Sequence, residues 1–241
     1  MKLESACCVV TGAGRGIGLA IAQALLAEGA RVIFGDVDAA ALGAAVAATK
    51  SGTAAGVKSD VTSVASMAAL ADEAARRFGP VRVWVNNAGL ARHKRIVDYT
   101  EAEIDLQLAV NLKGAIAGSQ AALRAMTPQR AGHIINIIST ASLRGIPTES
   151  VYCAAKWGVR GFTQGLREEA APLGIRVSGV LPGGVDTPFW PDAVGDRPMP
   201  VQNFLTVKQV GDAVVALVRM EDSVVPQELV LRALLDRDFS S

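Results

Sequence analysis

Short apolar runs rich in β-branched residues alternate along the chain with longer stretches rich in alanine and leucine. The short runs predict strands at ACCVVT (6–11), RVIFGD (31–36), AAGVKSDV (54–61), VRVWVNNAG (81–89), HIINIIS (133–139) and IRVSGVLPG (175–183), and a last strand at 228–233. The stretches between them predict helices over 16–28, 38–50, 63–78, 101–127, 150–171 and 207–220.

Strands that are apolar throughout, linked by helices, predict a parallel sheet covered on both faces. Right-handed crossovers then give an α/β fold with a doubly wound, Rossmann-type sheet of about seven strands. The chain has no linker and no internal repeat, so residues 1–241 are expected to form one domain. The segment 186–206 is rich in proline, aspartate and glycine, and we expect it to form a substrate loop.

Composition narrows the range of functions. Half of the 241 residues are hydrophobic and the net charge is +1, which argues against nucleic acid as a partner because phosphate binding needs clustered positive charge. The three cysteines form no CxxC pair, and with only two histidines we expect no metal site. No apolar run reaches membrane-spanning length and the first residues do not resemble a signal peptide, so a soluble, cytoplasmic protein is expected.

The first predicted strand leads directly into TGAGRGIG (11–18) and then into a helix. Gly12 permits a tight turn, Gly16 lets the backbone approach a pyrophosphate, and Gly18 allows close contact between helix and strand. The alternative is a plain strand-to-helix turn with surplus glycines. Because phosphate groups bind readily at a glycine-rich helix N-terminus, the pattern predicts a dinucleotide site.

Asp36 ends the second predicted strand. A carboxylate at this place can accept hydrogen bonds from both hydroxyls of an adenosine ribose and repels a 2′-phosphate, which favours NAD over NADP. Asp36 could instead be a turn or helix-capping residue. Arg15, inside the glycine turn, could reach a 2′-phosphate, so NADP stays possible.

Tyr152 and Lys156 lie four residues apart in VYCAAKWG (151–158), a stretch predicted to be helical. Residues at this spacing share one helix face. A tyrosine hydroxyl titrates near pH 10, and a neighbouring cation lowers that pKa toward a value useful for acid/base chemistry. Taken alone, the spacing also fits an ordinary helix.

Together these residues resemble the short-chain dehydrogenase/reductase family, and the resemblance extends over almost the whole chain. TGAGRGIG resembles its TGxxxGxG motif, and NNAG (86–89) and LPGGVDTP (181–188) resemble its segments after the fourth and sixth strands. Four residues align with the family's catalytic tetrad: Asn111, Ser139, Tyr152 and Lys156.

The resemblance implies roles for these residues. Tyr152 would be the general acid/base, Lys156 would lower its pKa together with the oxidised nicotinamide ring and bind the nicotinamide ribose, Ser139 would bind the substrate oxygen, and Asn111 would support a water for proton relay. Asn111 could instead cap or kink its helix, and Ser139 could only end a strand. The implied cofactor contacts are Gly12, Arg15, Gly16, Ile17, Gly18, Asp36, Asp60, Val61, Asn87, Gly89, Tyr152, Lys156, Pro182, Gly183, Val185 and Thr187.

The predicted function is therefore hydride transfer between a nicotinamide cofactor, NAD preferred, and a secondary alcohol or ketone. The alternatives are an NADPH-dependent carbonyl reductase and a non-catalytic, cofactor-binding regulator. The candidate substrate contacts are His93, Ser139, Arg144, Phe189 and Trp190, although His93 and Arg144 could also be ordinary surface residues. The resemblance further implies a homotetramer or homodimer.

Overall fold

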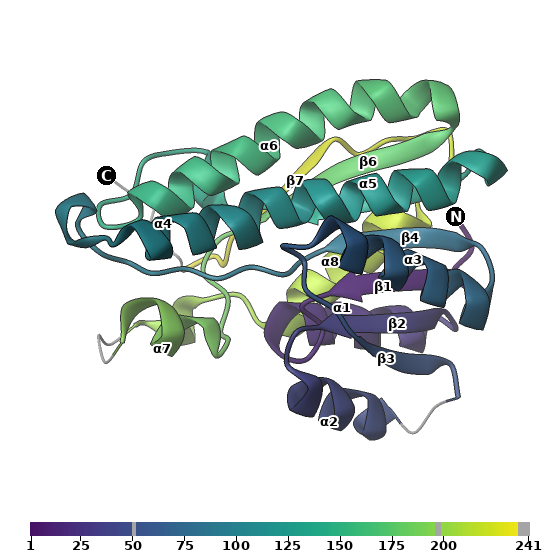
Figure 1. Ribbon diagram of the computed structural model, residues 1–241, viewed down its shortest axis with the longest axis horizontal. Coiled ribbons are helices and arrows are strands. Elements are labelled where there is room, and N and C mark those ends of the chain that lie inside the picture. The colour runs from purple at the N-terminus through teal and green to yellow at the C-terminus, as the bar shows by residue number, and fades with distance from the viewer. Residues whose placement is uncertain (50–51, 196–198, 236–241) are drawn as a thin grey trace.

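The computed structural model describes residues 1–49, 52–195 and 199–235, and its centre is a seven-stranded parallel sheet (Figure 1). The strand order is β3-β2-β1-β4-β5-β6-β7, so the chain winds outward from β1 in both directions. The strands are β1 (Cys7–Thr11), β2 (Arg31–Asp36), β3 (Ala54–Lys58), β4 (Val81–Asn86), β5 (Gly132–Ile137), β6 (Ile175–Pro182) and β7 (Glu228–Leu231). The predicted doubly wound sheet is confirmed.

Helices cover both faces of the sheet (Figure 1). They are α1 (Gly16–Ala27), α2 (Ala39–Thr49), α3 (Val64–Phe78), α4 (Glu101–Leu108), α5 (Gly114–Met126), α6 (Ser150–Ala170), α7 (Phe189–Val194) and α8 (Val207–Arg219). In β1, Cys8 and Val10 pack with α1, α2 and α8, whereas Cys7 and Val9 pack with α3, α5 and α6. Successive residues of a strand point to opposite faces, so two apolar layers require strands that are apolar throughout.

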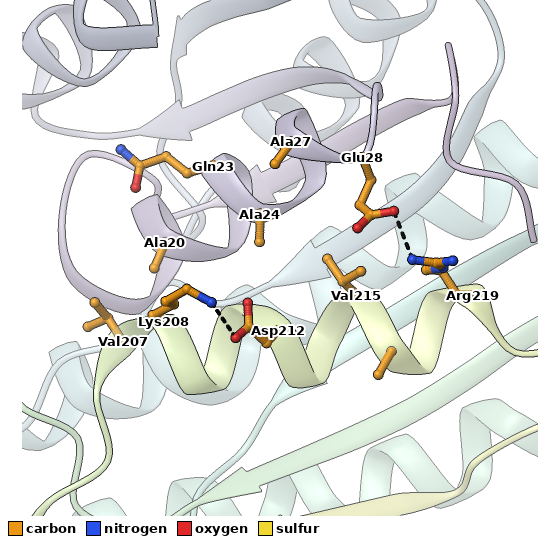
Figure 2. Close-up of a pocket in the computed structure, with 11 residues that line it drawn as sticks. Ala20, Gln23, Ala24, Ala27, Glu28, Val207, Lys208, Asp212, Val215 and Arg219 are labelled. Carbon is orange, nitrogen blue, oxygen red and sulfur yellow. Dashed lines mark hydrogen bonds and ion pairs between the residues drawn. The ribbon is translucent and has the colours of Figure 1, made fainter.

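A close contact between α1 and α8 holds the helix that follows the glycine turn. Alanines of α1 line a groove of about 810 Å³ against α8 (Figure 2). A Cβ atom on Gly211 of α8 would lie 3.0 Å from the Ala20 carbonyl oxygen, so the two backbones nearly touch. At one end of the contact, Arg219 pairs with Glu28 at 3.1 Å. This packing fixes the first turn of α1, which carries Gly16 and Gly18.

The predicted continuous helix over 101–127 is wrong in its middle, where a π-helical turn (Ala109–Lys113) separates α4 from α5. The Asn111 side-chain amide donates to the Gln107 carbonyl at 2.9 Å. That carbonyl would accept the Asn111 backbone N–H in a regular α-helix, so the side chain competes with the backbone and the helix widens. The turn sets Asn111 inward, where it is buried.

The predicted loop 186–206 contains the short helix α7. Its two ends lie side by side at the edge of the fold. Val185 forms a bridge with Leu205, and the Asp186 N–H donates to the Leu205 carbonyl at 2.9 Å. The loop between these residues is therefore closed at its base and carries α7 beside the carboxyl ends of the strands.

Residue 50 of the predicted helix 38–50 and residues 196–198 of this loop lie outside the described residues. Among the helices that are described, none has the length and apolar character needed to cross a membrane.

Candidate active site

A cavity of about 660 Å³ opens at the carboxyl ends of the strands, where the order of a doubly wound sheet reverses around β1 and β4. Most of the predicted cofactor and substrate residues line it. Its walls include Gly12, Arg15, Gly16, Ile17, Asp36, Asp60, Val61, Asn87, Gly89, His93, Ser139, Tyr152, Lys156, Pro182, Gly183, Val185, Thr187, Phe189 and Trp190. Three predicted residues lie outside these walls: Gly18, Asn111 and Arg144.

The glycine turn has room for a ligand on one side and none on the other. Gly12 and Gly16 have φ angles of +63° and +58°, which favour glycine. A Cβ on Gly18 would lie 2.1 Å from the Gly12 carbonyl oxygen, so only glycine fits there. A Cβ on Gly16 would meet nothing closer than Thr187, at 3.7 Å. The open side therefore faces the cavity, and the turn fits a nicotinamide dinucleotide cofactor, with its pyrophosphate at the N-terminus of α1.

Asn87 and Thr11 join the end of β4 to the glycine turn. The Asn87 side-chain amide donates to the carbonyls of Thr11 and Gly12 at 3.0 and 3.2 Å. The Thr11 hydroxyl accepts from the Asn87 and Ala88 backbone N–H groups at 3.0 and 3.2 Å. Thr11 is a site-building residue that the sequence analysis did not single out, and its position at the end of the first strand was the available signal.

Asp36 is held in place at the rim of the same turn. Its two carboxylate oxygens accept the Gly14 N–H at 2.8 Å and the Asp38 N–H at 3.0 Å. Arg15 reaches across the cavity mouth to Asp192 of α7, with a guanidinium-to-carboxylate distance of 2.8 Å. The Asp36 carboxylate thus lies where an adenosine ribose is expected. The Arg15 guanidinium, which could bind a 2′-phosphate, is paired with Asp192 instead.

Tyr152 forms the wall of the cavity together with Ser139. The Ser139 side chain lies beside that of Tyr152, and its hydroxyl accepts the Ala141 N–H at 3.1 Å. Burial raises the pKa of Tyr152 well above its usual range, the hydrogen bond with Ser139 opposes that effect, and the Glu149 carboxylate adds to it. The sequence predicted only lowering influences on this pKa, from Lys156 and from the oxidised nicotinamide ring. The structure shows that burial is the largest influence and acts in the opposite direction.

Lys156 lies one helical turn beyond Tyr152 on α6 and is buried. Its ammonium donates to the Ile137 carbonyl at 3.1 Å and lies 5.6 Å from the centre of the Tyr152 ring. Burial lowers the pKa of Lys156 to about 8, because a desolvated ammonium is less stable than a desolvated amine. Helical spacing therefore brings the two groups together, as the sequence indicated.

Asn111 acts from behind the cavity wall. Its side-chain amide donates to the Leu90 carbonyl at 2.7 Å, and its oxygen accepts the Leu90 N–H at 3.3 Å. A Cβ on Gly89 would lie 2.8 Å from that oxygen and 3.7 Å from the Lys156 ammonium. The π-helical turn thus sets Asn111 against the segment that follows β4, close to Lys156.

Aromatic rings close the end of the cavity beside Tyr152. Its ring centre lies 6.0 Å from that of Phe189 and 6.2 Å from that of His93, and Trp190 packs on Phe204 at 5.1 Å. Sequence reasoning missed Phe204, because it lies fifteen positions beyond Phe189, at the far end of the loop. Arg144, a candidate substrate contact, instead has its carbonyl close to the Cys153 thiol.

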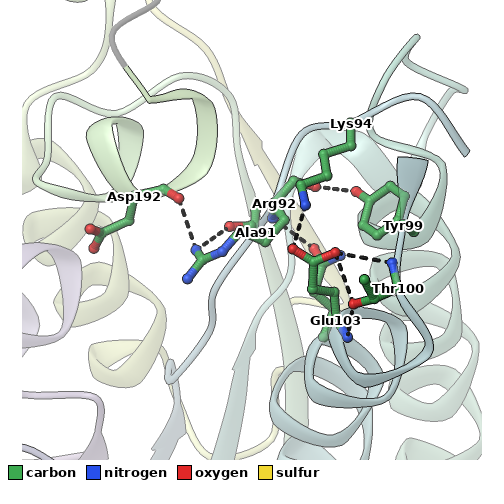
Figure 3. Close-up of polar contacts among 8 residues, drawn as sticks. Ala91, Arg92, Lys94, Tyr99, Thr100, Glu103 and Asp192 are labelled. Atoms are coloured by element: carbon green, nitrogen blue, oxygen red, sulfur yellow. Dashed lines mark hydrogen bonds and ion pairs between the residues drawn. The ribbon is translucent and has the colours of Figure 1, made fainter.

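Polar contacts hold α7 over this end of the cavity (Figure 3). The Arg92 guanidinium donates to the carbonyls of Ala91 and Asp192 at 2.9 and 2.8 Å. Arg92 is itself fixed, because its N–H donates to the buried Gln107 at 3.0 Å and its carbonyl accepts the Tyr99 hydroxyl. The described residues contain no group of three or more histidine, cysteine or acidic side chains placed to hold a metal ion.

Comparison with known proteins shows which family model the chain matches and which characterised proteins it is similar to. Residues 6–197 match the family model described as short chain dehydrogenase. The chain is 39% identical over 186 residues to 2-(S)-hydroxypropyl-CoM dehydrogenase 3 of Xanthobacter autotrophicus, covering 76% of this chain and 73% of that protein. It is 41% identical over 181 residues to 3-alpha-(or 20-beta)-hydroxysteroid dehydrogenase of Mycobacterium bovis, covering 75% and 69%.

Solved structures agree with these matches. An alcohol dehydrogenase from the archaeon Thermococcus sibiricus, complexed with 5-hydroxy-NADP, superposes with a TM-score of 0.86 at 29% identity. Levodione reductase superposes with a TM-score of 0.88 at 27% identity. Each match covers 95% of this chain and 97% of the other.

Proposed function

The chain belongs to the short-chain dehydrogenase family, and on that premise we propose that it transfers a hydride between a nicotinamide cofactor and a small secondary alcohol or ketone. The observation that carries the proposal is the placement of Ser139 and Tyr152 in one cavity wall, with the Lys156 ammonium 5.6 Å from the tyrosine ring. These groups share one cavity with the glycine turn. A proton-transfer group and a dinucleotide site therefore meet in one place.

Tyr152 serves as the general acid when a ketone is reduced. Burial keeps its pKa high, so at neutral pH it holds the proton that the substrate oxygen needs. The Ser139 hydroxyl donates a hydrogen bond to the same oxygen and stabilises the charge that develops there. The bound cofactor supplies or accepts the hydride. In the oxidative direction Tyr152 takes up the hydroxyl proton, and the Lys156 ammonium favours the tyrosinate form.

Asn111 and Lys156 are proposed to connect Tyr152 with solvent. Asn111 holds the Leu90 backbone through both of its amide atoms, and Gly89 lies between its oxygen and the Lys156 ammonium. This arrangement supports a role for Asn111 in ordering a water beside Lys156, through which protons leave and return.

NAD is the proposed cofactor. The Asp36 carboxylate already accepts two backbone N–H groups and retains lone pairs for ribose hydroxyls. A 2′-phosphate at the same place would lie beside a like charge, which costs about 4 kcal/mol at 4 Å and an effective dielectric constant near 20. Asp60, Val61, Pro182, Gly183, Val185 and Thr187 line the cavity and are proposed to contact the rest of the cofactor.

An NADPH-dependent carbonyl reductase is the second candidate. Arg15 lines the cavity beside Asp36, and one structural neighbour was solved with 5-hydroxy-NADP. For Arg15 to bind a 2′-phosphate it would exchange its ion pair with Asp192 for the phosphate. The relative kcat/KM with NAD and NADP separates the two candidates.

We further propose that the chain works as one domain in a cytoplasmic homotetramer or homodimer. Ile116 of α5 and Trp157 of α6 are exposed apolar residues, and burial against a second subunit would remove them from water. Light scattering of the purified protein tests this, and a monomer at micromolar concentration would contradict it.

Absorbance at the reduced-nicotinamide band tests the proposed function. NAD and NADP are each offered with a panel of secondary alcohols, and NADH and NADPH with the matching ketones. We expect turnover with NAD at higher kcat/KM than with NADP. Turnover with NADP alone would leave the proposed hydride transfer intact and contradict the inference that Asp36 favours NAD. Cofactor binding without turnover on the whole panel would favour a non-catalytic, cofactor-binding regulator.

A further inference from the structure

A histidine and a glutamate from distant parts of the sequence form a pair beside Tyr152. The distance from His93 Nδ1 to Glu149 Oε1 is 3.4 Å. The His93 side chain is only 2% exposed and that of Glu149 is 14% exposed, yet both residues line the cavity. A carboxylate this close to an imidazole nitrogen favours one orientation of the ring, because the negative charge attracts the side of the ring that carries the proton.

The backbones of both residues are anchored. The His93 N–H donates to the Ala193 carbonyl of α7 at 2.9 Å. Glu149 immediately precedes α6, and its carbonyl accepts the Cys153 N–H at 2.7 Å. Glu149 therefore lies one turn before Tyr152 on the same helix end, and its charge contributes to the raised pKa of Tyr152. The pair is held in a defined position relative to the reacting hydroxyl.

His93 is the polar member of an otherwise aromatic enclosure. Its ring centre lies 6.1 Å from Trp190, 6.5 Å from Phe189 and 6.2 Å from Tyr152. These ring distances allow one small molecule to reach both Tyr152 and His93. The two contacts would engage two substrate oxygens on neighbouring carbons, with the aromatic rings packing on the carbon skeleton.

The charges around the pair indicate that the second oxygen is uncharged. Glu149 would repel a carboxylate or phosphate at this position. The cations that line the described cavity have other partners: Arg15 pairs with Asp192, and Arg92 donates to the carbonyls of Ala91 and Asp192. The third, Lys156, donates to the Ile137 carbonyl. A neutral hydroxyl or carbonyl oxygen meets no such repulsion and can bond with the imidazole.

We propose that His93, positioned by Glu149, binds a second, uncharged oxygen on the carbon next to the one that is reduced or oxidised. The substrate class is then that of vicinal hydroxyketones and diols rather than simple ketones or hydroxy acids. This inference rests on the proposed function, because it places the reacting oxygen at Tyr152 and Ser139. His93 is a specificity-determining residue, and Glu149 is a positioning residue that acts through it.

The test compares 3-hydroxybutan-2-one with butan-2-one, which have the same carbon skeleton and differ by one hydroxyl. The measured quantity is the ratio of their kcat/KM values in wild type, His93→Phe and His93→Gln. Phenylalanine keeps a ring against Trp190 and removes both nitrogens, so we expect the ratio to fall about 10- to 100-fold. Glutamine keeps an N–H donor and should restore part of the ratio. Intrinsic reactivity cancels, because each ketone is compared with itself across the variants.

Glu149→Gln should lower the same ratio by a smaller factor, because the amide still meets the imidazole without its charge. Asp98→Asn is the matched control: it makes the same chemical change on a residue that lies outside the cavity and pairs with Arg95, and it should leave the ratio unchanged. An unchanged ratio in His93→Phe would overturn the inference, and so would an equal loss in His93→Phe and His93→Gln. Either result requires measurable turnover, so it leaves the proposed function intact.

A binding measurement separates failure of this inference from failure of the proposed function. Isothermal titration of 3-hydroxybutan-2-one into Tyr152→Phe, with and without His93→Phe and each saturated with the oxidised cofactor, measures binding without turnover, because the hydroxyl that would take up the proton is absent. Weaker binding with His93→Phe would uphold the His93 contact even if the wild type reduced neither ketone, in which case the proposed function alone would fail. Equal binding would overturn the contact.

Discussion

Replacing Lys156 with methionine should change how the stability of the protein depends on pH. Lys156 is buried on α6, donates to the Ile137 carbonyl at 3.1 Å, and has its pKa lowered by burial from 10.5 to about 8. Methionine has a similar length and carries no charge, so it removes the desolvated ammonium and keeps most of the packing.

The magnitude follows from the two pKa values. Between pH 8 and 10.5 the unfolded chain holds a proton on Lys156 more often than the folded protein does, so the wild type gains free energy of unfolding as pH rises. Integrated from pH 7 to pH 10, this gain is about 2–3 kcal/mol. The methionine variant lacks it. Loss of the hydrogen bond to Ile137, about 1 kcal/mol, shifts the variant equally at every pH and leaves the slope unaffected.

The assay is urea unfolding of wild type and Lys156→Met at several pH values from 7 to 10. The free energy of unfolding of the variant, minus that of the wild type, should fall by about 2–3 kcal/mol across this range. Lys208→Met is the control, because Lys208 is exposed and pairs with Asp212 at the surface. The difference in free energy of unfolding between this variant and the wild type should not change with pH. A flat difference for Lys156→Met as well would refute the claim that this ammonium is desolvated.

Two further substitutions test the cofactor site. Gly18→Ala places a Cβ 2.1 Å from the Gly12 carbonyl oxygen, so it should lower the free energy of unfolding by about 1–3 kcal/mol and weaken NADH binding, measured by urea unfolding and fluorescence titration. Unaltered stability and affinity would show that the turn is looser than described. Asp36→Ala removes the carboxylate that accepts from Gly14 and Asp38, and it should raise the kcat/KM with NADP relative to NAD about tenfold or more. An unchanged ratio would mean that Asp36 does not select the cofactor.

Local patterns in the sequence predicted the features that depend on local spacing. Strands that are apolar on both faces require a covered parallel sheet, and the structure has one. The four-residue interval between Tyr152 and Lys156 predicted a shared helix face, and both residues lie on the cavity side of α6. The glycine turn was recognisable because its residue types are constrained by backbone geometry at each position.

Features that arise from tertiary contacts could not be predicted in this way. The π-helical turn at Asn111 results from a side chain that competes for the Gln107 carbonyl, and hydrophobic periodicity carries no trace of such competition. The raised pKa of Tyr152 results from burial, which depends on residues distant in sequence. The contact between His93 and Glu149 joins the segment after β4 to the segment before α6, and only the folded sheet brings these two segments together.

The measurement that tests the central claim most directly is the kcat/KM of Tyr152→Phe. It is determined with the best substrate of the panel, and the absorbance of the reduced nicotinamide reports the rate. Phenylalanine keeps the ring and removes the hydroxyl that would transfer the proton. We expect a loss of about 10²- to 10⁴-fold, with cofactor affinity and the urea unfolding midpoint close to those of the wild type. Turnover close to the wild-type value in the folded variant would contradict the claim that Tyr152 is the general acid/base.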